Sequence, residues 1–570
     1  MRLTLSAENA LGGLQLTTLA TLICFPASRA APTSSSDLFR RNNTLSSINE
    51  YLERRTDLIA EERAIRFDAG VIQNATSKEL KAIEIVDALR RREQESVWSA
   101  DRNKEPGMPF LWAKDAIVQT DLFKLIKKMP KGALLHAHSD AIVDAKYLLQ
   151  LALDYPSIHI RTASGINSSG PLPAPIFRPL SQIEAEQYVN NSFPTSADYV
   201  PNSWVSAQRF RERFPNELGG KDAFDKWIIS AMTIGADDAY LQYNTTAKIW
   251  EKFTNTFLVA LGLTRYEPIY RRYTDQLLLS QIEDGVSYVE IRLGYSPART
   301  VISEDGTRNL TNSEVLDITQ SIIDEVKARL QGQGRGNEFI GARIIYSATR
   351  SISVPEMAKQ LDDCLELKAK YPELIAGFDM AGQEDPGHPL MFFAEALLDF
   401  RSKAEKRGLD IPFMFHAGET LDDGGEVDSN LYDAYLLGAK RIGHGFSLAK
   451  HPLLMQKYRE NGIAVEICPI SNELLRLTRS ANTHILPILL NNGVPVALSS
   501  DDPAVFQNPG LSFDFYQTIV ASNITNILSL GKLARQSLEY SSLNRTANDA
   551  ALGLWDLRWN GFIDEIVVSN

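Results

Sequence analysis

From residue 133 onward, short apolar runs that are typical of buried strands alternate with helical hydrophobic patterns. The runs are Ala133–Asp140, Val286–Leu293, Phe339–Ser347, Leu374–Gly382, Pro412–Glu419, Arg441–Phe446, Val465–Asn472 and Val494–Pro503. Strands separated by helices form parallel sheets with helices outside, so the alternation predicts an α/β fold. A doubly wound sheet is the alternative, but polar residues end nearly every run, which favours a barrel. We predict a (β/α)8 TIM-type barrel.

One connection in this predicted barrel is much longer than the others. About 145 residues lie between the first two runs, whereas a crossover with its helix can be as short as about 10–12 residues. Part of the connection is rich in Pro, Ser and Asn, including PLPAP at residues 171–175. In barrel enzymes, the loops that cover the substrate follow the C-terminal ends of the strands, where this connection begins. We predict a barrel domain over residues 129–570, with a loop-rich subdomain inserted at about residues 155–225.

The segment before the barrel has a different pattern. Residues 31–128 carry helical hydrophobic spacing with charged faces and few strand signals. Two interpretations of this N-terminal helical block stay open. It is either a dimerisation or receptor surface, or a structural extension that packs on the barrel.

Residues 1–30 have the layout of a secretory signal peptide. Arg2 precedes an apolar stretch over residues 14–25, and the small residues Ser28 and Ala30 mark a cleavage site. A buried N-terminal helix is the alternative, and the stretch is too short to span a bilayer. No later stretch of the sequence reaches the roughly 18 uncharged apolar residues that a membrane span needs. We predict a secreted, extracellular protein without a membrane span.

Sequons, charge and cysteine content fit an extracellular protein that acts on a small molecule. Asn-x-Ser/Thr sequons, which predict a glycoprotein, begin at Asn42, Asn74, Asn167, Asn190, Asn244, Asn309, Asn523 and Asn544. The net charge of −12 argues against a nucleic-acid polymer as partner. Cys24 leaves with the signal peptide, and Cys364 and Cys468 are predicted to be buried free thiols.

Histidines and carboxylates gather at the C-terminal ends of the predicted strands, the face where barrel enzymes keep their active sites. Four of the eight histidines of the chain lie there. Residues two apart in a strand face the same way, so a His-x-His motif points both rings into the barrel mouth. The residues are His136 and His138 on the first run, His416 and Glu419 on the fifth, His444 on the sixth, and Asp501 and Asp502 on the eighth.

Part of this group has the composition of a zinc site. Three imidazoles and one carboxylate suit a single Zn²⁺ that keeps an open position for water. Zinc lowers the pKa of its bound water to about 7. The predicted ligands are His136, His138, His416 and Asp501.

The remaining residues fit the other roles in a hydrolytic reaction. His444 is a candidate general base or orienter of the attacking hydroxide, and Glu419 is a candidate general acid. We expect Asp502 to accept a hydrogen bond from a ring nitrogen of the substrate. Gly382, at the end of the fourth run, allows the backbone to approach a flat ring closely.

The chain resembles the adenosine deaminase branch of the amidohydrolase superfamily. The family's motifs appear in the family's order over about 370 residues, as Leu135-His136-Ala137-His138, His416-Ala417-Gly418-Glu419, Gly443-His444-Gly445 and Ser500-Asp501-Asp502-Pro503. Further segments look like the secreted adenosine deaminase-related growth factors, namely Met129–Gly132, Trp250–Phe253, Glu283–Gly285 and Tyr288–Arg292. With the signal peptide, the helical block and the long connection, the resemblance covers nearly the whole mature chain.

The resemblance implies hydrolytic deamination of adenosine or 2′-deoxyadenosine to inosine or 2′-deoxyinosine plus ammonia. By the family pattern, the four predicted ligands bind zinc, His444 and Asp501 position the hydroxide that attacks C6, and Glu419 protonates N1. No lysine ends the fourth run, where binuclear members of the superfamily carry a bridging carbamylated lysine, and this favours one zinc per chain. The resemblance also implies a homodimer through the N-terminal helices.

The same pattern assigns the substrate contacts. Gly382 and Asp502 hold the purine at N3 and N7, and Asp140 and Trp250 are candidates for contacts to the ribose. Ser139-Asp140 departs from the animal secreted enzymes. The long connection also lacks their disulfide, because no cysteine lies between Cys24 and Cys364.

Two other functions are weighed against adenosine deamination. An AMP or adenine deaminase of the same superfamily is the first, although AMP requires a cationic clamp for its phosphate and adenine requires no ribose-holding insertion. A non-catalytic extracellular protein that binds nucleosides or signals is the second. The presence of Glu419 with a complete ligand set argues against that second alternative.

Overall fold

The computed structural model describes residues 47–101, 103–167, 170–295 and 300–568. The predicted signal peptide and the sequon at Asn42 lie outside the described residues. The chain divides into two compact units, the first up to Ala60 and the second from Glu61 onward. Helix α1 (Ile48–Ala64) crosses this division, and all other described helices and strands belong to the second unit.

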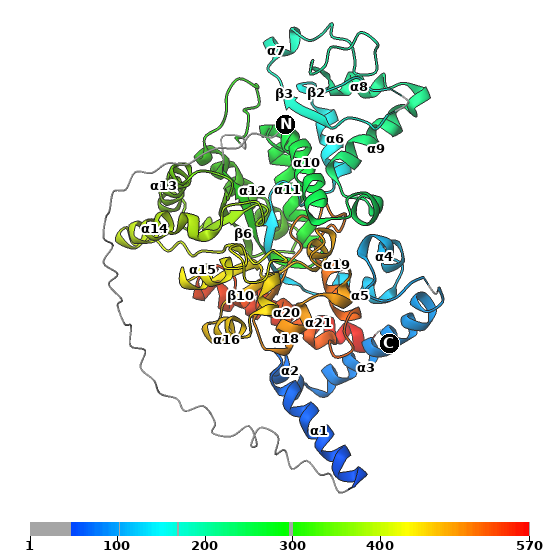
Figure 1. The fold of residues 1–570 in the computed structure, drawn as a ribbon, viewed down its shortest axis with the longest axis vertical. Coiled ribbons are helices and arrows are strands. Elements are labelled where there is room, and N and C mark those ends of the chain that lie inside the picture. The colour runs from blue at the N-terminus through cyan, green and yellow to red at the C-terminus, as the bar shows by residue number, and fades with distance from the viewer. Residues whose placement is uncertain (1–46, 102, 168–169, 296–299, 569–570) are drawn as a thin grey trace, which may run out of the picture. The chain divides into compact units, whose positions relative to one another are not determined.

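Eight parallel strands form the centre of the second unit (Figure 1). One sheet has the order β1-β5-β6-β7 and the other β11-β10-β9-β8. Parallel bridges between Ala137 and Asp501 and between Phe378 and Phe413 join the two sheets at both edges. The strands therefore follow one another in chain order, as in a TIM-type barrel, which confirms the predicted fold class. They are β1 (Gly132–His138), β5 (Val286–Gly294), β6 (Gly341–Thr349), β7 (Ile375–Ala381), β8 (His416–Ala417), β9 (Arg441–His444), β10 (Ala464–Ile467) and β11 (Val496–Leu498).

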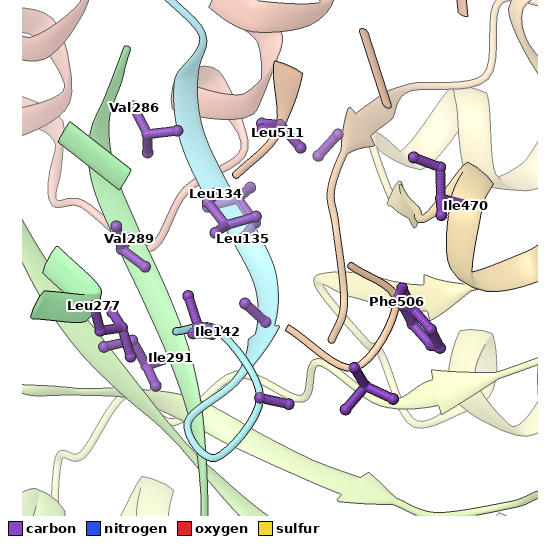
Figure 2. Close-up of a cluster of buried hydrophobic side chains, with 14 of the residues drawn as sticks. Leu134, Leu135, Ile142, Leu277, Val286, Val289, Ile291, Ile470, Phe506 and Leu511 are labelled. Atoms are coloured by element: carbon purple, nitrogen blue, oxygen red, sulfur yellow. The ribbon is translucent and has the colours of Figure 1, made fainter. Parts of the chain in front are cut away.

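Strand β1 shows why the predicted strands are apolar throughout. Leu134 and Leu135 are consecutive and so point to opposite faces, yet both are fully buried. Figure 2 shows them beside Val286 and Val289 of β5. A strand that is covered by side chains inside the barrel and by helices outside cannot alternate between apolar and polar residues.

Strand β8 is much shorter than the predicted strand Pro412–Glu419. The His416 N–H donates to the Asp379 side chain, with 2.9 Å between N and Oδ1, so it forms no ladder bond to the neighbouring strand. Pro412 has no N–H to donate. The backbone hydrogen bonds that join this part of the chain to β7 are those of Phe378 with Pro412 and Met414. The interrupted ladder brings the Asp379 carboxylate next to His416.

The long connection after β1 contains a small antiparallel sheet as well as loops. Its strand order is β3-β2-β4. Strand β3 packs against α10, where Gly262 is required because a Cβ there would lie 2.3 Å from the Phe177 carbonyl oxygen. Contact with the small sheet therefore fixes the position of α10 within the connection. Its elements are α6 (Ala145–Asp154), β2 (Ile158–Thr162), β3 (Pro175–Pro179), α7 (Gln182–Glu186), β4 (Val205–Ser206), α8 (Ala207–Glu212), α9 (Gly220–Met232), α10 (Thr246–Thr264) and α11 (Glu267–Glu283).

The helices before β1 pack on the last helices of the chain. Helix α3 contacts α20 and α21, and the Arg90 guanidinium donates to the backbone carbonyls of Ile519, Ser522 and Thr525. Helix α3 therefore behaves as a structural extension, which is one of the two interpretations of the N-terminal helical block. The helices are α2 (Ala69–Gln73), α3 (Ser77–Glu93), α4 (Phe110–Ile117), α5 (Asp121–Lys128), α20 (Ile527–Glu539) and α21 (Arg545–Val568).

The remaining helices surround the strands or follow their C-terminal ends. They are α12 (Asn312–Gly332), α13 (Val354–Lys370), α14 (Ala394–Lys406), α15 (Asn430–Leu436), α16 (Pro452–Asn461), α17 (Pro469–Leu474), α18 (Leu486–Asn491) and α19 (Ser512–Val520). None of the described helices combines the length and apolar composition that crossing a bilayer requires. Cys364 and Cys468 are buried free thiols, as predicted.

Candidate active site

The ends of four strands bring the predicted metal ligands and His444 together. His136 Nε2 lies 3.3 Å and His138 Nε2 lies 3.2 Å from the same oxygen, Asp501 Oδ1. The ring of His416 has its centroid 4.5 Å from that of His136. His444 faces the other carboxylate oxygen, with 3.9 Å between its Nε2 and Asp501 Oδ2. All five side chains therefore surround one point.

This geometry forms two overlapping groups that could hold a metal. In the first, ligand atoms of His136, His416, His444 and Asp501 lie within 4.8 Å of one another. In the second, His138 joins Asp501 and Asp502. The first group contains three of the four ligands that the sequence predicts, with His444 in place of His138.

Unpaired buried atoms show that the site fits a cation. In the described part of the chain, His136 Nε2 and Asp501 Oδ1 have no hydrogen-bond partner, although both are buried. Leaving a buried polar group unpaired costs about 1–3 kcal/mol. A metal ion at this point would use both atoms as ligands.

Two buried carboxylates orient the imidazoles from behind. His416 Nδ1 lies 2.8 Å from Asp379 Oδ2, and His136 Nδ1 lies 2.9 Å from Glu466 Oε2. A carboxylate accepts hydrogen bonds, so each Nδ1 carries the hydrogen and each Nε2 presents a lone pair to the centre. Arg292 connects the carboxylates, with Nε 2.9 Å from Asp379 and Nη2 2.6 Å from Glu466.

The sequence analysis did not identify these three supporting residues. The available signal was an ionisable residue inside an apolar run, since Asp379, Glu466 and Arg292 all lie in strands that are otherwise apolar. Such residues are rarely buried without partners. Their pairing joins residues 87 and 174 positions apart.

The charges of the site follow from burial and from these contacts. Burial opposes ionisation of Asp501, but the close contacts with the imidazoles of His136 and His138 outweigh it and hold the Asp501 pKa well below its usual value. Burial lowers the pKa of His416 to about 3 even though Asp379 acts in the opposite direction. The floor of the site therefore holds an ionised Asp501 and a neutral His416 at neutral pH.

Two further carboxyl groups have raised pKa values, in contrast to Asp501. Burial, and then the negative charge of Asp501, raise the pKa of Glu419 well above its usual value. The same two causes raise the pKa of Asp502. Both groups are buried, with Glu419 5% and Asp502 1% exposed. These shifts favour the protonated form of both groups, which can donate a hydrogen bond.

Backbone conformation at the site is unusual for non-glycine residues. His444 has φ 62° and Asp501 has φ 59°, in the left-handed region that non-glycine residues seldom adopt. Such strain of about 1–3 kcal/mol persists only where the surrounding structure imposes it, and it gathers at functional sites. Gly382 has φ 106°, which a side chain would oppose.

A cavity of about 330 Å³ opens onto these groups. Among the predicted substrate residues, Trp250, Gly382 and Asp502 line it. Asp140 does not line it in the described structure, and lies instead in a small neighbouring cavity with Tyr270 and Tyr273.

One wall of the cavity comes from helix α10, which the sequence analysis did not assign to the site beyond Trp250. Its apolar residues recur every three or four positions, the spacing of one face of a helix, and this was the available signal. The α10 residues that line the cavity are Trp250, Phe253, Thr254, Phe257, Leu258 and Leu261, followed by Arg265 just beyond the helix.

Comparisons with known proteins identify the family of the chain. The family model described as adenosine deaminase matches residues 222–553, and the model described as adenosine/AMP deaminase N-terminal matches residues 33–126. Adenosine deaminase 2-A of Danio rerio is 34% identical over 81% of this chain and 85% of its own length. Adenosine deaminase 2 of Homo sapiens is 31% identical over 90% of this chain and 93% of its own length.

Solved structures share the fold at low sequence identity. Arabidopsis ADAL in complex with IMP superposes with a TM-score of 0.51 at 15% identity, over 77% of this chain and 99% of that one. A Zn-bound cog1816 amidohydrolase of Burkholderia ambifaria gives a TM-score of 0.50 at 16% identity, over 78% and 95%. Since the family model covers more than half of the chain and the relatives match nearly their whole length, the chain belongs to the adenosine deaminase family and is a hydrolytic purine deaminase.

Proposed function

We propose that the protein is a secreted zinc-dependent adenosine deaminase that converts adenosine or 2′-deoxyadenosine to the inosine form plus ammonia. One observation carries the proposal. The raised pKa of Glu419 makes it a proton donor, and it lines the same cavity as the His/His/His/Asp group. A buried acid next to a metal-ligand set is what hydrolytic removal of a ring amino group requires.

The proposed metal is one Zn²⁺ per chain, held by His136, His138, His416 and Asp501. Three neutral imidazoles and one carboxylate form a ligand set that zinc accepts, and the Zn-bound amidohydrolase with the same fold supports this choice. When bound, zinc supplies a water molecule of lowered pKa. Asp379 and Glu466 hold two of the imidazoles in the tautomer that leaves Nε2 free.

The other residues move protons and hold the base. Protonated Glu419 donates its proton to N1 of the purine, which makes C6 more electrophilic. His444, on the far side of Asp501, orients or deprotonates the attacking water. The raised pKa of Asp502 favours its protonated form, and in our proposal this form donates a hydrogen bond to the purine N7 lone pair. This reverses the direction expected from the sequence.

The remaining contacts concern selectivity. Gly382 presents its backbone to N3, and Trp250 is proposed near the ribose, whereas Asp140 lies outside the cavity lining and is assigned no ribose contact. AMP is the second candidate substrate, because Arg265 lines the cavity and an arginine can pair with a phosphate. The apolar α10 wall favours the uncharged nucleoside.

Secretion and a homodimer through the N-terminal helices complete the proposal. Seven of the sequon asparagines lie among the described residues, and all seven are solvent-exposed, as glycosylation requires. Sedimentation of the mature chain measures its oligomeric state. Enzymatic removal of N-glycans from protein collected from culture medium tests glycosylation by a loss of mass.

Three measurements on the purified protein test the activity. Adenosine, AMP and adenine are compared as substrates, and we expect adenosine to be used best; equal kcat/KM on AMP would overturn the nucleoside assignment. Metal analysis is expected to give one zinc per chain. Glu419→Gln is expected to lower kcat by roughly 10²–10⁴-fold with zinc retained. A non-catalytic nucleoside-binding protein would instead show no turnover before the substitution and unchanged binding after it.

A further inference from the structure

The side-chain amide of Asn472, on α17, lies between two imidazoles. Its Nδ2 is 3.1 Å from His444 Nδ1, and its Oδ1 is 3.0 Å from His484 Nε2. Asn472 and His444 are at most 1% exposed and His484 is 6% exposed. Asn472 and His484 lie behind His444 and outside the set of residues that line the cavity. They can therefore influence the reaction only through His444.

The direction of these hydrogen bonds is fixed at the His484 end. The Leu486 backbone N–H donates to His484 Nδ1, with 2.9 Å between the nitrogens. A backbone N–H can only donate, so His484 Nδ1 carries a lone pair and the hydrogen of the ring lies on Nε2. Burial lowers the pKa of His484 to about 3, which agrees with a neutral ring.

The Asn472 amide determines which ring nitrogen of His444 carries the hydrogen. His484 Nε2–H donates to Asn472 Oδ1, which turns the Asn472 NH₂ group towards His444. An amide NH₂ can only donate, so His444 Nδ1 accepts and the hydrogen of that ring lies on Nε2. Glu419 Oε1, at 3.6 Å from His444 Nδ1, is beyond normal hydrogen-bond distance.

His444 therefore has the opposite tautomer to His136 and His416, whose Nδ1–H groups donate to carboxylates. His136 and His416 present Nε2 lone pairs to the centre, whereas His444 presents an N–H. A nitrogen that carries a hydrogen cannot coordinate a metal. The hydrogen bond from Asn472 therefore excludes His444 as a metal ligand, and His138 remains as the fourth ligand.

We propose that Asn472 and His484 are positioning residues that hold His444 as its Nε2-protonated tautomer. In this state His444 donates a hydrogen bond to the attacking oxygen, and does not remove its proton. The consequence for the reaction rests on the proposed deaminase function, whereas the tautomer itself does not.

Nitrogen NMR of the zinc-bound protein tests the tautomer directly. The protein is labelled with ¹⁵N-histidine, the His444 signals are assigned with His444→Gln, and two-bond ¹H–¹⁵N correlations identify the protonated nitrogen. We expect a protonated Nε2 and an unprotonated Nδ1 for His444. A protonated Nδ1 overturns the proposal. If the protein has no deaminase activity, the proposed function fails but this readout still decides the tautomer.

Asn472→Asp reverses the direction of the hydrogen bond between residue 472 and His444. The carboxylate of Asn472→Asp can only accept, so we expect His444 Nδ1 to become protonated and kcat to fall about 100-fold, with KM and zinc content unchanged. His484→Leu removes the donor without adding charge, and a smaller fall in kcat is expected, with partial recovery in His484→Gln. His451→Gln is the matched control, since His451 pairs with Asp428 elsewhere. An unchanged kcat in both Asn472→Asp and His484→Leu overturns the proposal.

Discussion

The floor and the wall of the cavity are built from different elements and different chemistry. The floor consists of the ionisable groups at the strand ends, of which His136 and Asp501 are at most 2% exposed. The wall consists of the α10 side chains, of which Leu258 is 60% exposed. Strand ends that are hydrogen-bonded to neighbours hold ionisable groups in one geometry, whereas a helix face offers apolar area without fixed direction. We therefore assign the chemistry to the floor and the selection of substrate to the wall.

Removal of the metal affects the floor alone and has the largest expected effect. Dialysis against a chelator is expected to abolish deamination and to lower the melting temperature, because the ligands would lose the ion that pairs them. Added Zn²⁺ is expected to restore both. The measurements are activity and thermal unfolding at each zinc content. Full activity in zinc-free protein would contradict the assignment of the floor.

Asp379→Ala weakens the floor from behind. It leaves Arg292 with one carboxylate partner fewer and His416 without its orienting group. We expect the free energy of unfolding to fall by about 3–5 kcal/mol and zinc affinity to fall by about 10–100-fold. Denaturant unfolding and metal titration measure these changes. Asp363→Ala, at a carboxylate that pairs with Asn312 and Tyr346, is the control for zinc affinity. Equal zinc affinity in the two variants would remove Asp379 from the site.

Glu384→Gln changes the charge near Glu419 without touching the metal ligands. Glu384 accepts hydrogen bonds from the Gly418 and Glu419 N–H groups, and its charge helps to raise the Glu419 pKa. Glu419 must be protonated to act as an acid, so activity is lost as pH rises through its pKa. Removing the negative charge lowers that pKa and is expected to move the alkaline limb of kcat/KM to lower pH. A pH–rate profile measures the shift, and a limb that stays in place would exclude Glu419 as its origin.

Leu258→Ser tests the wall and has the smallest expected effect. The side chain is partly exposed, so its loss removes about 1 kcal/mol or less of apolar contact with the substrate. We expect KM to rise by up to about fivefold, with kcat and zinc content unchanged. Leu398→Ser is the matched control, because Leu398 is 55% exposed and lies on α14, outside the cavity lining. A fall in kcat for Leu258→Ser would show that wall and floor are not separate.

Much of the floor was predictable from the sequence because its residues lie within short motifs. Residues two positions apart in a strand share a face, so the His-x-His motif placed His136 and His138 together without any tertiary information. Position at a strand end then placed Asp501 on the same side of the barrel. The short β8 was not predictable, since it depends on the Asp379 side chain from another strand capturing the His416 N–H.

The sequence by itself determined the order of strands and helices, the residue types at the strand ends and the apolar face of α10, because periodicity and motif spacing are local. Tertiary structure alone decided which buried group stands behind each imidazole. Glu466 reaches His136 across 330 positions of sequence, and Asn472 reaches His444, at the end of β9, from helix α17. A hydrogen-bond partner sets the tautomer of an imidazole and burial sets its charge, and neither is local in sequence. The sequence therefore identifies the histidines of the site, whereas the fold determines their tautomers and charges.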